Sequence, residues 1–292
     1  MKKILAPTDF SRMSRAGLKF GIQLASQGLY EITFYHSYSL LLPTQWNEAE
    51  TAQFEKIEAK RILENLIKFV AAVYRSIGVE RGKTNCVVEK GVMPERDIME
   101  YASYNNFDLI CMSTHGAGSR LERLWGTNTG NLVNYSGVPV IAVPSGYKPL
   151  PITNILYASD LQHVEMEFPK VVDFSATMQA DIELFHLKAG GEKTYSGDTL
   201  SKTLKKLSTL KIDVDIKDLE PDESVSAAIQ KRIKKKKPSL LVMFTNRNKN
   251  WFQRIFQSSH AEQYSFHPKI PLLVYRKPDI VQRESPLHSV PL

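Results

Sequence analysis

The chain carries one sequence pattern twice, in the same order. The segment ILAPTDF, which begins at Ile4, aligns with ILYASDL, which begins at Ile155, at an offset of 151 residues. The next match, FYHS on LFHL, places His36 on His186 at an offset of 150 residues. Two later matches, DLICMST on SLLVMFT and PVIAV on PLLVY, have offsets of 131 and 132 residues. Four matches in one order are hard to attribute to chance, so we expect two copies of one fold.

A change in the repeat offset and a proline-containing connector together indicate where the domains begin and end. The offset falls from 150 to 131 residues between the second and third matches, so the second copy lacks 19 residues there, opposite 40–76 of the first copy. The proline-containing stretch KPLPIT, near residue 148, separates the copies. For a chain of 292 residues, we therefore predict a domain at 1–148, a second domain at 149–278 and a tail at 279–292 that lacks periodicity.

Strand and helix patterns alternate within each copy. Apolar, β-branched stretches such as LICM and VIAV are typical of strands buried on both faces, and stretches of helical spacing separate them. Parallel strands need crossover connections, whose helices cover both faces of a sheet. The predicted fold class is therefore α/β, with two tandem, doubly wound parallel sheets. In the first copy we expect strands at 2–7, 31–37, 83–91, 107–114 and 138–144, and helices at 47–76, 94–104 and 127–135 besides one that contains Ala16, Phe20 and Leu24.

Composition and charge argue against several functional classes. Hydrophobic residues make up 42% and charged residues 24%, as in an ordinary soluble globular protein. The excess of 38 Lys and Arg over 31 Asp and Glu is too diffuse to indicate nucleic acid. The basic run KRIKKKKP at 231–238 lies at the end of an expected helix, where cations complement the helix dipole, and it has no aromatic residue for stacking on bases. We expect no nucleic-acid partner, and no membrane partner because no apolar run reaches the length of a membrane span.

The cysteines and the first residues bear on the compartment. Cys86 and Cys111 lie in apolar stretches, as small buried hydrophobic residues of a reducing compartment do. The segment MKKILAPTDF reaches a proline and an aspartate before an apolar segment develops, unlike a signal peptide. We expect a cytoplasmic protein.

A glycine-containing segment follows the fourth expected strand. In STHGAGSRLERLWGTNTGNLV, nine residues separate Gly116 from Gly126, and Thr127, Asn128 and Thr129 follow. Glycines let the backbone approach an anion, and the N-terminus of the next helix presents free N–H groups, so the segment suits phosphate. The glycines alone would equally indicate turns. The position favours a ligand, because ligands of open α/β sheets bind beyond the carboxyl ends of the strands, where the strand order reverses.

Asp9 follows the first expected strand, which would adjoin the fourth strand at that position. A carboxylate repels a polyphosphate at close range, so we assign Asp9 to the nucleoside end, where it can accept hydrogen bonds from ribose hydroxyls or an exocyclic amine. The alternative is an N-cap or turn residue beside Ser11.

The segments PTDFS near the start, MSTHG after the fourth strand, GT nine residues after it and PVIAV at the last strand resemble the universal stress protein family in its tandem two-domain form. The resemblance spans Lys3 to Lys277 and is stronger in the first half. Nucleotide-binding members of that family carry the pattern Gly, two residues, Gly, nine residues, Gly and Ser or Thr. Here Ser113 replaces the first glycine. Its side chain either crowds the backbone approach to the ligand or adds a hydroxyl donor.

The resemblance implies a fold, a ligand and a set of contacts. The fold would be Rossmann-like, of the adenine nucleotide alpha hydrolase-like type, with PVIAV and PLLVY paired as edge strands in a pseudo-dimer and other surfaces left for a homo-oligomer. The ligand would be ATP or AMP, with Mg²⁺ accompanying ATP. Ser37 would replace a branched apolar residue at the adenine and give it less apolar contact. The implied binding residues are Pro7, Thr8, Asp9 and Ser37 at the adenosine, Met112, Ser113, His115 and Gly116 beside the ribose and phosphates, and Gly126, Thr127, Asn128 and Thr129 at the phosphates.

The second copy lacks the glycines that suit a phosphate. At the offset of 131 residues, Arg247 takes the place of Gly116 and Gln257 takes that of Gly126. Residues other than glycine disfavour positive φ and place side chains where the anion would lie. We therefore expect one nucleotide site, in the first domain only, and a structural role for Asp160.

Catalytic residues are hard to identify in this sequence. His115 and Ser113 could be drawn as a base and a nucleophile, but no third group and no G-x-S-x-G turn accompany them. His36 and His186 are expected to be core histidines, and no metal-ligand spacing is present. The leading hypothesis is a stress-response nucleotide-binding protein that is non-catalytic or hydrolyses ATP weakly. The alternatives are a ligand-free scaffold for structure or protein interaction, and a slow hydrolase of adenylate compounds.

Overall fold

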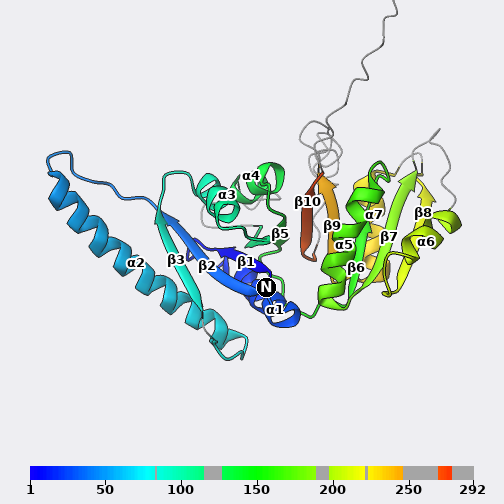
Figure 1. The fold of residues 1–292 in the computed structure, drawn as a ribbon, viewed down its shortest axis with the longest axis horizontal. Coiled ribbons are helices and arrows are strands. Elements are labelled where there is room, and N and C mark those ends of the chain that lie inside the picture. Colours follow the sequence, from blue (N-terminus) through cyan, green and yellow to red (C-terminus); the bar gives the residue numbers. More distant parts are fainter. Residues whose placement is uncertain (83, 115–126, 189–196, 221–222, 246–268, 278–292) are drawn as a thin grey trace, which may run out of the picture.

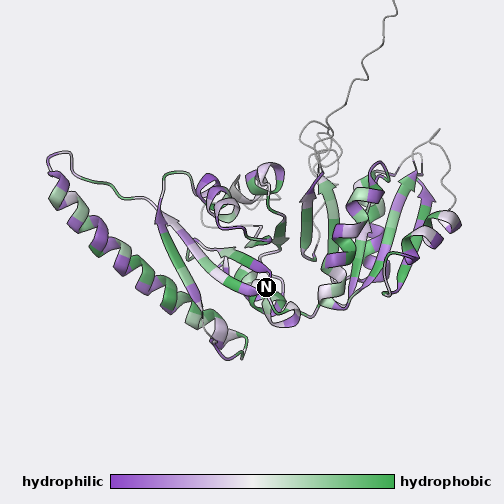
Figure 2. Ribbon diagram, viewed as in Figure 1, coloured by the Kyte–Doolittle hydropathy of each residue, from purple (hydrophilic) through white to green (hydrophobic). Residues whose placement is uncertain are grey.

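The computed structural model describes residues 1–82, 84–114, 127–188, 197–220, 223–245 and 269–277. These residues form one sheet with helices on both faces, and its strands run in the order β3-β2-β1-β4-β5-β10-β9-β6-β7-β8 (Figure 1). The pairs are parallel except for the central pair of β5 and β10. Hydrophobic residues run along the strands, whereas the helices mix hydrophobic and polar residues (Figure 2). The α/β, doubly wound fold class is confirmed.

The observed elements of the first half follow the predicted ones closely, and α3 and α4 have the predicted bounds. The first half contains β1 (Lys3–Pro7), α1 (Arg15–Gly28), β2 (Glu31–Tyr38), α2 (Glu48–Ser76), β3 (Asn85–Lys90), α3 (Pro94–Tyr104), β4 (Leu109–Ser113), α4 (Thr127–Tyr135) and β5 (Val140–Val143). The second half contains β6 (Asn154–Ala158), α5 (Val164–Met178), β7 (Asp181–Lys188), α6 (Gly197–Lys205), β8 (Ile212–Asp218), α7 (Val225–Lys236), β9 (Leu240–Thr245) and β10 (Leu272–Arg276).

Successive side chains of a strand point to opposite faces of the sheet, so the first half has one core layer on each face. Leu5 of β1 belongs to a core cluster with Ile98 of α3 and Leu132 of α4, on one face of the sheet. Ala6, the next residue of β1, packs with Leu18 of α1 on the opposite face, where α2 also contributes. Residues two apart on a strand share a face, so this layering decides which way the residues at the strand ends point.

The strand order reverses between β1 and β4. β1 pairs with β2 on one side, from Lys3↔Glu31 to Pro7↔Tyr35, and with β4 on the other, where Ile4 lies opposite Leu109. The chain moves outward from β1 through β2 to β3 and then returns to β4 on the other side. The carboxyl ends of β1 and β4 therefore flank the position where open α/β sheets bind ligands.

The two halves are joined by strand pairing in one sheet and by side-chain contacts, among them those of Gln27. β5 and β10 pair antiparallel, with Leu273 opposite Ile141, which confirms the predicted pairing of the PVIAV and PLLVY segments. Gln27 of α1 donates from Nε2 to the carbonyls of Ile152 and Met178 at 2.7 and 2.9 Å, and its Oε1 accepts from the Ile152 N–H at 2.8 Å. Edge pairing satisfies backbone groups that would otherwise be unpaired, so the halves form the expected pseudo-dimer.

Helix α2 is the largest difference between the halves. It has 29 residues, whereas its counterpart α6 has 9. The difference falls where the repeat offsets predict that the second copy is shorter. Asn47 caps it: the Asn47 side chain accepts from the Glu50 N–H and the Glu50 side chain accepts from the Asn47 N–H, each at 2.9 Å. Its buried residues begin at Leu66, so the preceding turns extend beyond the sheet (Figure 1). Among the described residues, no helix combines the length and the hydrophobicity that a membrane span requires.

Candidate functional site

Three of the predicted site residues share the face of the sheet that α3 and α4 cover. Pro7 follows Leu5 by two positions on β1, and Ser37 follows Tyr35 by two positions on β2. Leu5, Tyr35 and Met112 all belong to the core cluster of that face. Side chains two apart on a strand point the same way, so Pro7, Ser37 and Met112 come together at the carboxyl ends of β1, β2 and β4.

Thr8 holds the turn that follows β1. Its hydroxyl lies 2.8 Å from the Ser14 hydroxyl and accepts a hydrogen bond from the Phe10 N–H at 3.1 Å. Phe10 has a φ of 60°, a left-handed conformation that residues other than glycine seldom adopt. Asp9 is exposed in this turn, and one of its carboxylate oxygens accepts from the Ser11 N–H at 3.0 Å. Asp9 therefore has a turn role and also presents its side chain to solvent at the end of β1.

His36 of β2 supports this turn. Its Nδ1 lies 2.7 Å from the Thr8 carbonyl oxygen, and its ring centroid lies 4.3 Å from that of Phe10. Burial lowers the pKa of His36, and the contact with Thr8 opposes that shift. His186 makes the same contact with the Ser159 carbonyl at 2.9 Å in the second half. Both histidines hold backbone turns; His186 is 2% exposed, as expected for a core histidine, whereas His36 is half-buried.

Ser113 connects β4 to α1. Its hydroxyl accepts from the Gly17 N–H at 2.8 Å, which satisfies one of the unpaired N–H groups at the start of α1. A Cβ on Gly17 would lie 2.5 Å from the Ser113 nitrogen, so only glycine lets α1 approach β4 this closely. The Ser113 side chain thus points to the α1 face. It neither crowds the α3 and α4 face nor offers a donor there.

Thr129 fixes the start of α4 on the end of β4. Its hydroxyl donates to the Ser113 carbonyl at 2.9 Å, and the residue is 2% exposed. The N-terminus of α4 therefore begins beside the carboxyl end of β4, where its free N–H groups and the helix dipole favour an anion. Because its hydroxyl donates to the Ser113 carbonyl, we assign Thr129 the role of positioning α4.

Asp97 is a neighbour of the site that the sequence analysis missed. It lies on the first turn of α3 and accepts a hydrogen bond from the Ser37 hydroxyl at 2.5 Å. A Cβ on Gly91 would collide with the Asp97 carboxylate, so the glycine after β3 makes room for this contact. The spacing of Gly91, Pro94 and Asp97 was the available sequence signal. A nucleobase placed beside Ser37 would therefore meet a hydroxyl that already donates a hydrogen bond to the Asp97 carboxylate.

The predicted residues of the glycine-containing segment lie at the limit of the described structure. Thr127 and Asn128 are the first two residues of α4. Their contacts with a ligand stay a prediction. Outside the described residues lie His115, Gly116 and Gly126 and, in the second half, Arg247 and Gln257.

The second half repeats the turn but not the exposed aspartate. Leu161 has a φ of 59°, and its N–H donates to the Ser159 hydroxyl at 3.0 Å. Asp160, the counterpart of Asp9, forms an ion pair with Lys277 at 2.6 Å, and the two side chains are 18% and 8% exposed. The aspartate that is exposed in the first half is therefore covered by a lysine in the second, which agrees with the structural role expected for Asp160.

Lys277 also reaches a second carboxylate, that of Glu167 on α5, at 3.4 Å. Glu167 is 1% exposed and accepts a hydrogen bond from the Tyr157 hydroxyl. Burial raises the pKa of Glu167, while Tyr157 and Lys277 oppose the rise. The second half thus holds its own cation between two carboxylates near the end of β6, where ligands of such sheets bind.

Aromatic side chains fill the region around this cluster. The ring centroid of Phe244 lies 5.7 Å from that of Tyr157 and 5.0 Å from that of Tyr275. Helix α5 therefore meets its sheet through large side chains, whereas α1 meets β4 backbone to backbone. At the repeat offsets, Tyr157, Phe168 and Phe244 take the places of Ala6, Gly17 and Ser113.

Comparison with known proteins places these features in context. The sequence profile described as the Universal stress protein family matches residues 1–144. A universal stress protein of Methanocaldococcus jannaschii is 26% identical over 153 residues, which is 49% of this chain and 94% of that protein. The crystal structure of a universal stress protein from Archaeoglobus fulgidus has a TM-score of 0.68 at 15% identity and covers 94% of this chain and 98% of that chain. A universal stress protein crystallised with cAMP is 17% identical, covers 50% of this chain and 98% of that chain, and has a TM-score of 0.37.

Proposed function

The chain belongs to the universal stress protein family through its residues 1–144, and from this premise we propose that its first half binds one adenine nucleotide, ATP or AMP, while its second half binds none. The protein would serve in a stress response as a nucleotide-binding module without strong catalysis. The second half would be a packing partner that completes the sheet.

The contrast between two matching aspartates carries this proposal. Asp9 is exposed at the end of β1, beside the reversal of strand order. Asp160 occupies the same turn in the second half, but its carboxylate is already paired with the buried Lys277. A nucleoside that approached Asp160 would have to displace Lys277 from its buried ion pair. The occupied position in the second half therefore favours the first half as the nucleotide-binding half.

Two kinds of contact in the first half suit a nucleotide. Pro7, Ser37 and Met112 share one face at the strand ends, on the side where the base and ribose would lie. The N-terminus of α4, which begins at Thr127, suits the phosphates, and the preceding glycine-containing segment would add main-chain N–H groups. Asp9 would stay at the ribose, because a carboxylate repels phosphate.

We infer that Mg²⁺, when present, comes with ATP, since this cation prefers phosphate oxygens and water. Within the described residues, no group of three or more His, Cys, Asp or Glu side chains is arranged to hold a metal ion. Of the two groups considered for hydrolysis, Ser113 accepts a hydrogen bond from the Gly17 N–H with its hydroxyl, and His115 lies outside the described residues. The contact of Ser113 favours nucleotide binding with slow hydrolysis at most.

Isothermal titration calorimetry with ATP and Mg²⁺ on the full chain tests the proposal. Gly126→Arg introduces a long side chain where the phosphates would lie, and Gln257→Arg makes the matching change in the second half. We expect the wild-type protein and Gln257→Arg to bind ATP alike, and Gly126→Arg to bind it at least about tenfold more weakly, a difference of about 1.4 kcal/mol. If both variants lose the binding heat, or both keep it, the assignment to the first half is wrong.

The two alternative functions predict other results. A ligand-free scaffold would give no heat with ATP or AMP in any of the three proteins. The contact between Ser37 and Asp97 favours that alternative, because it makes the base side of the site polar. A slow adenylate hydrolase would release phosphate steadily, and Gly126→Arg would abolish the release.

A further inference from the structure

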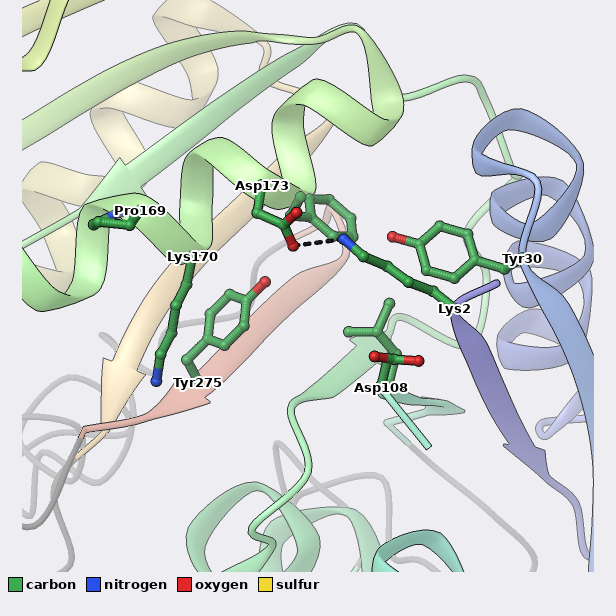
Figure 3. Close-up of a pocket in the computed structure, with 9 residues that line it drawn as sticks. Lys2, Tyr30, Asp108, Pro169, Lys170, Asp173 and Tyr275 are labelled. Atoms are coloured by element: carbon green, nitrogen blue, oxygen red, sulfur yellow. Dashed lines mark hydrogen bonds and ion pairs between the residues drawn. The ribbon is translucent and has the colours of Figure 1, made fainter. Parts of the chain in front are cut away.

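A pocket of about 310 Å³ lies where the two halves meet, at the amino-terminal ends of β1 and β4 (Figure 3). The candidate nucleotide site lies at the opposite, carboxyl ends of these strands. Because β10 runs antiparallel to β5, its last residues reach the amino-terminal edge of the first half. Pockets of this size accept small molecules. The first half contributes Tyr30, Asp108 and Leu109, and the second half contributes Asp173, Phe174 and Tyr275.

The walls of the pocket are aromatic and buried. Tyr30, Phe174 and Tyr275 are 7%, 3% and 8% exposed. The Tyr275 hydroxyl points into the pocket (Figure 3), and it makes no hydrogen bond with the residues that the structure describes. The hydroxyl therefore faces the open side of the pocket, where it is available to a hydrogen-bonding group of a bound molecule.

Negative charge acts on both phenol groups. Burial raises the pKa of Tyr30 to about 12, and the carboxylates of Asp173 and Asp108 contribute to the rise. Burial also raises the pKa of Tyr275, with contributions from Tyr30 and Asp173. The Asp173 carboxylate therefore acts on both phenol groups, and the Lys2 ammonium offsets part of its charge.

The two lysines that border the pocket leave one carboxylate without a cation. The Lys2 ammonium pairs with Asp173 at 2.5 Å. The Lys170 ammonium points away from Asp108 and Asp173 (Figure 3). Asp108 accepts a hydrogen bond from the main-chain N–H of Lys3 at 2.7 Å but forms no ion pair with any described residue. Two lysines and two aspartates line the pocket, and Asp108 is the carboxylate among them that pairs with no described cation.

We propose that this pocket binds a small organic ammonium compound that carries a ring or another apolar body. The ammonium N–H groups would donate to the Asp108 carboxylate and the Tyr275 hydroxyl, and the cation would lie near the ring of Tyr30. The apolar body would pack on Leu109 and Phe174. The site does not depend on nucleotide binding, since none of its residues belongs to the candidate nucleotide site.

Titration of the full chain with benzylammonium, followed by nuclear magnetic resonance, tests the proposal. One ion pair and one cation–π contact predict a dissociation constant in the millimolar range. Benzyl alcohol has the same ring without the charge, and benzoate carries the opposite charge. Both should bind at least about threefold more weakly than benzylammonium.

Variants of the lining residues sharpen this test. Asp108→Asn and Tyr275→Phe each remove one partner while keeping the shape, and each should weaken binding about threefold. Lys2→Met should tighten binding, because it frees Asp173 from a competing ammonium group. Asp181→Asn, at the exposed start of β7, is the matched control and should have no effect. Melting temperatures report whether each variant is folded.

Three results would overturn the proposal. They are equal binding of benzoate and benzylammonium, no saturation with benzylammonium, and unchanged binding in both Asp108→Asn and Tyr275→Phe. Gly126→Arg should leave benzylammonium binding intact, which separates this site from the nucleotide site.

Discussion

Lys277→Met removes a buried positive charge and keeps a flexible apolar side chain of similar length. The Lys277 ammonium lies 2.6 Å from the Asp160 carboxylate and 3.4 Å from that of Glu167, and the residue is 8% exposed. The substitution leaves two neighbouring carboxylates without the cation that they share. We expect it to destabilise the protein strongly.

The magnitude follows from the burial of the partners. Removing one member of a buried ion pair costs about 3–5 kcal/mol, because the other charge stays in the interior. Glu167 is 1% exposed, whereas the side chain of Asp160 is 18% exposed and retains some hydration. The Tyr157 hydroxyl still donates to Glu167, and the Gln162 N–H still donates to Asp160. These contacts place the expected loss at the lower end, about 3 kcal/mol in the free energy of unfolding.

The loss should also depend on pH. Burial raises the pKa of Glu167 in the folded protein, and Lys277 opposes that rise, so the pKa should be higher still in Lys277→Met. A group whose folded pKa exceeds its unfolded value contributes stability below the unfolded pKa, and this stability is lost as the pH rises through the folded pKa. The variant should therefore be closer to the wild type near about pH 5 than near about pH 8.

Urea denaturation at the two pH values measures both effects. Lys90→Met is the matched control, because Lys90 pairs with Glu55 at the surface, where its side chain is 46% exposed. A surface pair contributes about 0–1 kcal/mol. A loss for Lys277→Met as small as that of the control, or a loss that grows towards acid pH, would refute the argument from burial.

Three further changes probe packing around the site and the junction. Gly17→Ala should lower the free energy of unfolding by about 1–3 kcal/mol, because the added Cβ would collide with the β4 backbone. Gly137→Ala is the control, since a Cβ there would meet no atom within 4 Å. Calorimetric melting compares the two variants. Cys111 is buried, and burial raises the pKa of its thiol, so iodoacetamide should label it only after unfolding, which mass spectrometry can follow. Gln27→Ala should lose about 1–3 kcal/mol in urea denaturation, since it leaves backbone groups at the junction unpaired.

Sequence periodicity predicts the elements of the first half closely because their signals are local. Pro94 suits the first turn of a helix, and the predicted helix at 94–104 is the observed α3. The shortened segment of the second copy is likewise observed, in the difference between α6 and α2. The antiparallel pairing of β5 and β10 is also observed, although its prediction came from the family resemblance and not from a local pattern.

The contacts that shape the site lie beyond such reasoning. Ser113 is 96 positions from Gly17, and Lys277 is 117 positions from Asp160. Nothing in the sequence around either residue marks a partner at that distance, because only the strand order brings them together. Sequence analysis therefore named Ser113 but misjudged the alternatives for its hydroxyl, and it missed Lys277 altogether.

Both halves contain the same turn after their first strand, but different side chains surround it. The left-handed residue, the hydroxyl that binds its N–H and the histidine beneath are present in both copies, so the backbone of the turn cannot be the source of a functional difference. The difference lies in charge and volume. In the second half, Asp160 and Glu167 hold Lys277 in place, and a ligand entering there would have to separate a buried cation from its partners. The cation therefore closes this position of the second half to a ligand, whereas Asp9, the counterpart of Asp160 in the first half, is exposed to solvent.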